Sequence, residues 1–256
     1  MTNPLLKVNH LSKQFGGVTA LNDVSFEIIQ NEVFGLIGPN GAGKTTLFNV
    51  ITGFYEPSQG DVFLSGFPIN NLKTHEIVQQ GLARTFQNIR LFSSMSALEN
   101  VMVGFHARTK KGIIGAILRD KKTKEEEHFI KEQAEKLLQF VGLTTQKNHL
   151  STHLSYGDQR RLEIARALAT QPSLLALDEP AAGMNATETD KLKELIQKIK
   201  EKKITILLIE HDMKLVMDSC DRILVLNYGK KIALGSPKEI QQNPCVIEAY
   251  LGGALS

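Results

Sequence analysis

A glycine-rich segment, GPNGAGKT at Gly38–Thr45, carries residues that could hold a chain of phosphates. It matches G-x-x-x-x-G-K-[ST] and lies between an expected strand and an expected helix, the context this motif requires. Its glycines let backbone N–H groups point at phosphate oxygens, Lys44 would neutralise the β- and γ-phosphates, and Thr45 would ligate Mg²⁺. We therefore predict ATP or GTP binding. The predicted nucleotide-binding residues are Gly38, Pro39, Asn40, Gly41, Ala42, Gly43, Lys44, Thr45 and Thr46.

Two carboxylates follow an apolar run in LLALDEP, residues 174–180. Ligand sites in open α/β sheets form at the carboxyl ends of strands, so Asp178 and Glu179 should face the nucleotide. Asp178 could hold the Mg²⁺ shell through water, and Glu179 could polarise a water for attack on the γ-phosphate. The alternative is that both acids only cap the following segment.

Three further positions are weaker signals when each is taken alone. His211 ends the apolar run of LLIEHD, where it could donate a hydrogen bond to the γ-phosphate and orient the attacking water. Gln87 in ARTFQNIRLF ends another expected strand at the entry to the helical lobe, but it could be a plain turn residue. Phe15 in LSKQFGG is an aromatic residue among polar ones, and it could be a core anchor.

Apolar runs alternate with amphipathic patterns in the part of the chain that carries these residues. Expected strands at 32–38, 173–180 and 204–212 are each followed by an expected helix, at 44–53, 187–202 and 213–220. This alternation predicts an α/β fold whose core is a mainly parallel sheet. Period-two alternation at 5–16, 18–29 and 60–66 adds an antiparallel β lobe.

Between residues 88 and 154 the strand signal disappears, and 96–107 and 124–143 have helical spacing. We predict one domain, with a nucleotide-binding core at 1–87 and 155–256 and a helical lobe at 88–154. Within the lobe, residues 108–127 place basic clusters around an apolar stretch. A solvated helix pair with a linker is favoured there over a contact with a permease or with lipid.

Composition excludes several classes of protein. Hydrophobic residues make up 42% of the chain and charged residues 22%, as in ordinary globular proteins. The chain has 30 basic and 27 acidic residues, a balance that does not indicate a nucleic-acid binder. The two cysteines, Cys220 and Cys245, lack metal-ligand or disulfide spacing and fit a reducing cytosol. No apolar run approaches a membrane span and the N-terminus is unlike a signal peptide, so a membrane role would be peripheral.

A second polar turn containing one glycine, in HLSYGDQRRLEIARAL at His153–Leu168, runs into an amphipathic helix and would also favour an anion. With it the chain resembles the ATP-binding cassette of ABC transporters over about Leu5–Gly235. The motifs that carry the resemblance are Phe15, GPNGAGKT, Gln87, LSYGDQ, LLALDEP and His211. In that family the signature turn contacts ATP held by a partner subunit, so two ATP molecules join a dimer. The signature residues here are Ser155, Tyr156, Gly157 and Asp158.

The resemblance also implies roles for single residues. It assigns adenine stacking to Phe15, contacts with Mg²⁺, water and the coupling pathway to Gln87, the catalytic base to Glu179 and the γ-phosphate switch to His211. This sequence departs from the common pattern at Tyr156 and Asp158 in the signature. It departs again in AAGMN, where Asn185 replaces the usual Asp, which puts any Asp-dependent contact across the dimer in doubt.

The signature, EPAAGMN and the basic-apolar-basic segment resemble the LivG type of cassette, which serves branched-chain amino acid importers. This implies a second ABC ATPase in a homo- or heterodimer, transmembrane permease subunits, indirectly a substrate-binding protein, and a place on the cytoplasmic face of the membrane. No nucleic-acid partner is expected. The open alternatives are a urea, amide or lipid cargo, a machine acting on DNA or ribosomes, and a nucleotide-dependent regulator with little catalysis.

Overall fold

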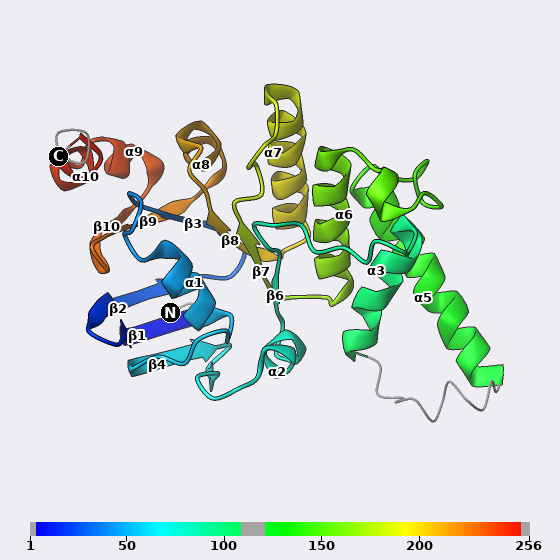
Figure 1. Cartoon of the computed structure of the whole chain (residues 1–256), viewed down its shortest axis with the longest axis horizontal. Coiled ribbons are helices and arrows are strands. Elements are labelled where there is room, and N and C mark those ends of the chain that lie inside the picture. Colours follow the sequence, from blue (N-terminus) through cyan, green and yellow to red (C-terminus); the bar gives the residue numbers. More distant parts are fainter. Residues whose placement is uncertain (1–3, 109–120, 252–256) are drawn as a thin grey trace.

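The computed structural model describes residues 4–108 and 121–251. Six strands form its main sheet (Figure 1), namely β3 (Val33–Ile37), β6 (Leu82–Arg84), β7 (Leu174–Asp178), β8 (Thr205–Ile209), β9 (Arg222–Asn227) and β10 (Lys230–Gly235). Their order is β10-β9-β3-β8-β7-β6, and every neighbouring pair is parallel except β9 with β10. Every residue of β3, β7 and β8 is buried, as expected for strands covered on both faces. The predicted mainly parallel sheet is confirmed.

A second sheet of four antiparallel strands lies at one end of the molecule. Its strands are β1 (Leu6–Phe15), β2 (Val18–Ile28), β4 (Gln59–Leu64) and β5 (Phe67–Pro68), in the order β2-β1-β4-β5. One face of this sheet packs toward the main sheet, where the rings of Phe26 and Phe34 stack with centroids 5.5 Å apart. The predicted antiparallel β lobe is confirmed.

Helices cover both faces of the main sheet. They are α1 (Lys44–Ile51), α2 (Thr74–Gln79), α3 (Ala97–Phe105), α5 (Lys121–Phe140), α6 (Tyr156–Ala169), α7 (Ala186–Glu201), α8 (Met213–Ser219), α9 (Pro237–Gln241) and α10 (Pro244–Leu251), with short 3-10 turns at His106–Arg108 and Ser151–His153. α1 lies between the two sheets, whereas α7 and α8 lie on the opposite face (Figure 1).

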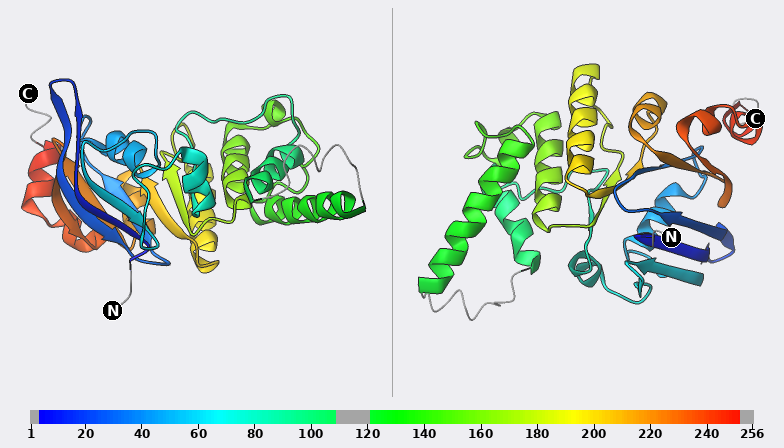
Figure 2. Two further views of the ribbon diagram at one scale, coloured as in Figure 1. Left: turned by 90° about the horizontal axis from the view of Figure 1, so that it is seen from below. Right: turned by 180° about the vertical axis from the view of Figure 1, so that it is seen from behind.

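α3, α5 and α6 form a group at the end of the molecule away from α10 (Figure 2). α3 and α5 lie within the predicted helical segment 88–154, and α6 packs against both although it begins after residue 154. Within the segment 108–127, residues 109–120 lie outside the described part of the chain. Among the described residues no helix combines the length and apolar character needed to cross a membrane.

Cys220 follows α8 and packs against the central strand β3. A Cβ placed on Gly35 would lie 2.9 Å from Cys220 Sγ, so a glycine is needed at this contact. Burial raises the pKa of the Cys220 thiol to about 12. The thiolate is the reactive form, so Cys220 should be inert near neutral pH, whereas Cys245 is exposed on α10.

Alkylation tests this packing. We expect iodoacetamide at mildly alkaline pH to label Cys245 in the native chain and both cysteines in concentrated guanidinium chloride, as counted by mass spectrometry. The Cys245→Ser variant should remain unlabelled until it is unfolded. Labelling of native Cys220 as fast as Cys245 would contradict this arrangement of α8 on β3.

Candidate nucleotide site

The segment Gly38–Thr45 leads from the end of β3 into α1. Gly38 has a φ of 153°, and a Cβ there would lie 2.2 Å from the carbonyl oxygen of Leu226. Gly43 has a φ of 99°, and a Cβ there would lie 2.7 Å from the carbonyl oxygen of Ala20. Both positions therefore require glycine, because the backbone is left-handed and neighbouring strands approach closely.

Lys44, the first residue of α1, places its ammonium group inside this loop. The side chain is buried, and Nζ donates to the carbonyl oxygens of Gly38 at 2.7 Å and Pro39 at 3.0 Å. Burial lowers the pKa of Lys44, and the negative charge of Glu179 opposes that effect. A cation at the start of a helix is suited to hold phosphates.

Three polar side chains meet where β6, β7 and β8 end. These strands are parallel neighbours, so the loops that follow them leave from the same edge of the sheet. Gln87 Nε2 donates to Glu179 Oε2 at 2.7 Å, and His211 Nε2 lies 2.8 Å from Glu179 Oε1. The structure thus brings together the three residues predicted for catalysis.

These side chains and the glycine-rich loop line one hollow of about 640 Å³. Its walls also include Val18–Ala20 of β2 and the Tyr228–Gly229 turn between β9 and β10. The N–H of Gly229 donates to the carbonyl oxygen of Ala42 at 3.0 Å, which fixes the turn against the loop. The volume lies within the range of small-molecule sites.

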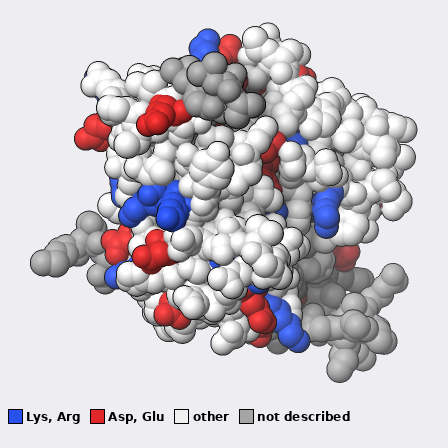
Figure 3. Space-filling view, turned by 60° about the vertical axis from the view of Figure 1, so that its left-hand side comes forward, with Lys and Arg blue, Asp and Glu red and all other residues white. Residues whose placement is uncertain are grey.

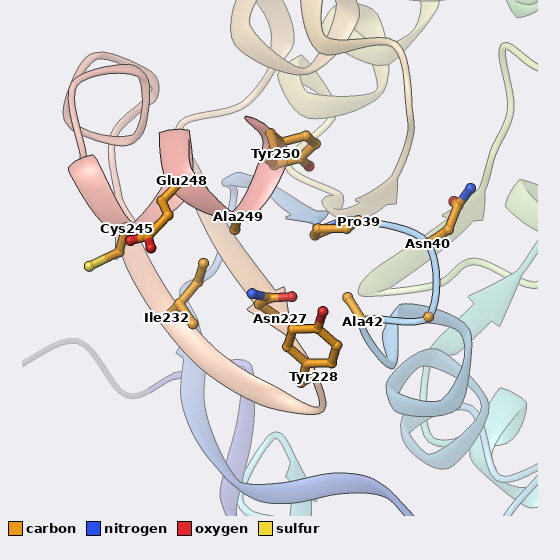
Figure 4. A pocket seen from close by; sticks show the side chains of 11 residues that line it. Pro39, Asn40, Ala42, Asn227, Tyr228, Ile232, Cys245, Glu248, Ala249 and Tyr250 are labelled. Carbon is orange, nitrogen blue, oxygen red and sulfur yellow. The ribbon is translucent and has the colours of Figure 1, made fainter. Parts of the chain in front are cut away.

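A second hollow, of about 770 Å³, lies on the other side of the glycine-rich loop (Figure 4). It shares Asn40–Ala42 and Tyr228 with the first hollow and is also lined by Pro39 and by residues of β9, β10 and α10. Burial raises the pKa of Tyr250 on α10, and a hydrogen bond with the Gly38 backbone opposes this shift. The C-terminal helix therefore lies directly behind the loop.

Sequence reasoning missed Arg84, the last residue of β6. Its Nη2 lies 3.1 Å from Asp178 Oδ2, and its Nη1 donates to Asn49 Oδ1 at 2.7 Å and to Thr52 Oγ1 at 2.8 Å. The aromatic rings around the guanidinium are those of Phe48, Phe54 and Phe86. Burial raises the pKa of Asp178, and the charge of Arg84 opposes that rise. Arg84 therefore ties Asp178 to the C-terminal end of α1.

Glu210 is a second buried charge that sequence reasoning missed. Its Oε1 accepts the N–H of Ala181 at 2.6 Å and its Oε2 accepts the N–H of His211 at 3.0 Å. Burial raises the pKa of Glu210, and these hydrogen bonds lower it. Glu210 thereby joins the loop after β7 to the loop after β8, which sets Glu179 opposite His211.

Phe15 ends β1 with 41% of its surface exposed, so it is not a buried core anchor. Its ring packs edge-on against Tyr55 with centroids 5.2 Å apart, and Lys13 Nζ lies 4.9 Å from its centre. The nearby wall of the first hollow is formed by Val18–Ala20. Adenine stacking on Phe15 stays a prediction.

The signature residues lie at the start of α6 and line no part of the first hollow. The Ser155 hydroxyl accepts the N–H of Asp158 at 3.2 Å and caps the helix. The sequence had suggested that Gly157 lies in a loop before the helix. It lies instead within the first turn of α6, because the Ser155 cap starts the helix at Tyr156. The Asp158 carboxylate pairs with Arg161.

Asn185, which replaces the usual Asp, caps the start of α7. Its Oδ1 accepts the N–H of Glu188 at 3.0 Å, while Glu188 Oε2 accepts the N–H of Asn185 at 3.1 Å. A Cβ on Gly157 would lie 2.7 Å from Glu188 Oε1, so the first turns of α6 and α7 are in contact. Asn185 therefore has a structural role on α7.

A glycine-rich phosphate loop, acidic residues at a strand end and a separate helix-capping serine define an ATP-binding cassette. Comparison with known families agrees, because the model of the ABC transporter family matches residues 21–182. The model named branched-chain amino acid ATP-binding cassette transporter matches residues 230–255. The chain belongs to the ABC transporter family, as an ATP-binding cassette ATPase.

Relatives match over the full chain. The high-affinity branched-chain amino acid transport ATP-binding protein LivG of Salmonella typhimurium is 48% identical, over 99% of this chain and 100% of that protein. The corresponding protein BraF of Pseudomonas aeruginosa is 47% identical over the same shares. These similarities confirm the expected resemblance to the LivG type.

Solved structures agree with the fold. The ADP conformation of MJ1267, an ATP-binding cassette of an ABC transporter, is 33% identical with a TM-score of 0.85, covering 98% of this chain and 100% of that one. The dimeric post-hydrolysis state of the cassette MJ0796, bound to ADP and Pi, is 25% identical with a TM-score of 0.76, covering 91% and 98%.

We expect Arg84→Met to lower the free energy of unfolding by about 3 kcal/mol, because it leaves Asp178 buried without its counter-ion. The folded-state pKa of Asp178, already raised, should rise further above its unfolded-state value. The contribution of Asp178 to the stability of the variant is then most favourable at low pH and is lost as pH rises through that pKa. The deficit relative to the parent should therefore shrink on acidification, as measured by urea unfolding.

The double variant Arg84→Met, Asp178→Asn serves as the control. It removes the unpaired charge and should recover most of the lost stability near neutral pH. A deficit that is the same at every pH, or that the second substitution does not reduce, would show that the ion pair is not the cause.

Proposed function

We propose that this chain is the ATP-hydrolysing subunit of an ABC importer for branched-chain amino acids. The observation that carries the ATPase assignment is the contact of Gln87 and His211 with Glu179 beside the glycine-rich loop. The cargo assignment is supported by the names of full-length relatives. In this proposal the chain works on the cytoplasmic face of a membrane, bound to permease subunits.

The proposed chemistry assigns one task to each group. Lys44 and the loop hold the phosphates, Glu179 accepts a proton from the attacking water, and His211 contacts the γ-phosphate. The hydrogen bonds between Glu179 and the side chains of Gln87 and His211 hold its carboxylate in place before the water binds. Phe15 supports the adenine.

Mg²⁺ suits the donors present. It prefers oxygen ligands and is usually bound by a few protein groups together with phosphates and water. Thr45, Gln87 and Asp178 supply hydroxyl, amide and carboxylate oxygens, with Asp178 acting through water. In the described part of the chain no group of three His, Cys, Asp or Glu side chains forms a metal cage, in keeping with this mode. The ion would neutralise phosphate charge.

The proposed working form is a dimer in which each signature turn meets ATP bound by the other subunit. Ser155 and Gly157 lie on α6 and not around their own chain's hollow, so a second subunit is needed for them to act. ATP offers a γ-phosphate to both subunits and ADP does not, so hydrolysis would favour separation. The dimeric structure of MJ0796, in a post-hydrolysis state with ADP and Pi bound, supports a dimer as the working form.

We propose that a permease segment binds in a groove of about 510 Å³ between β6, α3 and α6. Phe92 is 45% exposed there, and Arg90 and Arg166 add positive charge to apolar walls. The groove also contains Phe86, the residue before Gln87. A permease segment bound here would therefore press on the backbone that carries Gln87.

A different cargo, such as urea, an amide or a lipid, would leave this site unchanged, so the transport assay must decide. A machine acting on nucleic acid is the other candidate. On the face seen in Figure 3, basic and acidic side chains are interspersed, which favours the transport assignment.

We expect Glu179→Gln to lower ATP turnover at least about 100-fold, because it removes the proposed base. The variant should still bind Mg-ATP and accumulate as a dimer on size-exclusion chromatography. Lys44→Ala should lose nucleotide binding, and Glu201→Gln, at the exposed end of α7, should keep the parent rate. Turnover by Glu179→Gln at the parent rate would refute the assignment.

Reconstitution with permease subunits and a binding protein tests cargo and docking. Leucine, but not urea, should stimulate ATP hydrolysis and be taken up by the vesicles. Phe92→Glu should abolish capture by the permease while keeping the basal ATPase rate, and Phe67→Glu, exposed on β5, should keep both. Normal capture of Phe92→Glu would remove the groove as the docking site.

A further inference from the structure

A buried arginine connects the Gln87 segment to the signature helix. Arg160 lies in the second turn of α6 with 0% of its surface exposed. Its Nη2 donates to the carbonyl oxygen of Gln87 at 2.7 Å, and its Nη1 donates to the carbonyl oxygen of Phe86. A fully buried guanidinium is costly unless it is paired and hydrogen-bonded, so these carbonyls and Arg160 fix one another.

Glu163, almost one turn further along α6, completes this attachment. Its Oε2 lies 3.2 Å from Arg160 Nη1, and its Oε1 accepts the N–H of Arg90 at 3.2 Å. The pair is as buried as any core residue. α6 therefore holds the segment 86–90 through two carbonyl groups and one N–H group.

Tyr156 links the same guanidinium to the signature turn. Its hydroxyl accepts a hydrogen bond from Arg160 Nη2 at 3.1 Å. Its ring contacts Gly183 in the loop after Glu179, since a Cβ on Gly183 would lie 3.4 Å from the ring. The common signature has glycine at this position, which has no side chain to make either contact. Tyr156 directly follows Ser155, so this hydrogen-bond network extends to the residue that is proposed to contact ATP bound by the partner subunit.

We propose that Arg160 and Tyr156 are positioning residues that couple the two ATP sites of the dimer. Arg160 holds the backbone of Gln87 in its own site, and through Tyr156 it holds the Ser155 turn that serves the other site. A displacement of Gln87 moves the carbonyls bound to Arg160, and the planar guanidinium carries that displacement to the start of α6. This inference rests on the proposed dimeric ATPase.

The test compares Arg160→Lys with a control, Arg222→Lys, at a side chain that is 29% exposed. Arg222 pairs with Glu32 at 3.2 Å and donates to the carbonyl oxygen of Glu27. It is the first residue of β9, so it lies at the opposite end of the strands from the place where Gln87, Glu179 and His211 meet. Both substitutions keep the charge and remove the planar fork. We expect Arg160→Lys to lower kcat at least about tenfold with ADP affinity nearly unchanged, because hydrogen bonds to charged groups are lost away from the phosphates. Arg222→Lys should lose thermal stability and keep kcat.

Tyr156→Phe removes only a hydroxyl from a half-exposed side chain and covers the case in which Arg160→Lys does not fold. It should lower kcat about threefold to tenfold and bring the Hill coefficient for ATP toward one. In an Arg160→Lys background it should have no further effect, because the hydroxyl has already lost its donor.

Turnover by the unmodified protein tests the proposed function separately. If that protein hydrolyses ATP and Arg160→Lys and Tyr156→Phe both match its kcat and Hill coefficient, the coupling is overturned and the ATPase assignment stands. Equal losses of kcat in Arg160→Lys and Arg222→Lys, or additive losses in the Tyr156 and Arg160 double variant, would also overturn it.

Discussion

The site depends on one constraint, which is that neighbouring parallel strands end at the same edge of a sheet. Because β6, β7 and β8 run in the same direction, the loops that follow them meet, and Gln87 and His211 both reach the carboxylate of Glu179. An antiparallel strand among them would send its loop to the opposite edge. The apolar runs that bury these strands on both faces therefore also determine which polar residues become neighbours.

Buried charges then fix the loops that the sheet brings together. Arg84 joins Asp178 to the end of α1, Glu210 joins the loops after β7 and β8, and Arg160 joins the Gln87 segment to α6. Such groups add little net stability, because desolvation offsets their attraction, but removing one partner is costly. Each of these groups joins segments that are far apart in the sequence.

The sequence predicted β3, β7 and β8, the helices that follow them, and the loop and catalytic residues that meet in the hollow, because apolar periodicity and the glycine-lysine motif are local signals. It did not predict Arg84, Glu210 or Arg160. Arg84 and Asp178 are 94 residues apart, and Arg160 binds backbone carbonyls 73 and 74 residues away, so nothing near these residues marks their partners. An arginine on an amphipathic helix is usually solvated. Glu210 is visible in LLIEHD as a charged residue directly before His211, but only its contacts in the structure show which loops it joins.

The two departures from the common cassette pattern lie at one junction. Tyr156 packs on the loop after Glu179, and Asn185 caps α7 together with Glu188, whose carboxylate lies against Gly157. An aspartate would cap the helix equally well, so the local fold does not require the amide. The change from Asp to Asn instead removes a negative charge beside the signature turn, while Tyr156 adds a hydrogen bond beneath it. Neither change replaces a side chain of the Glu179 cluster itself, so both act through the contacts that the first turns of α6 and α7 make with their neighbours.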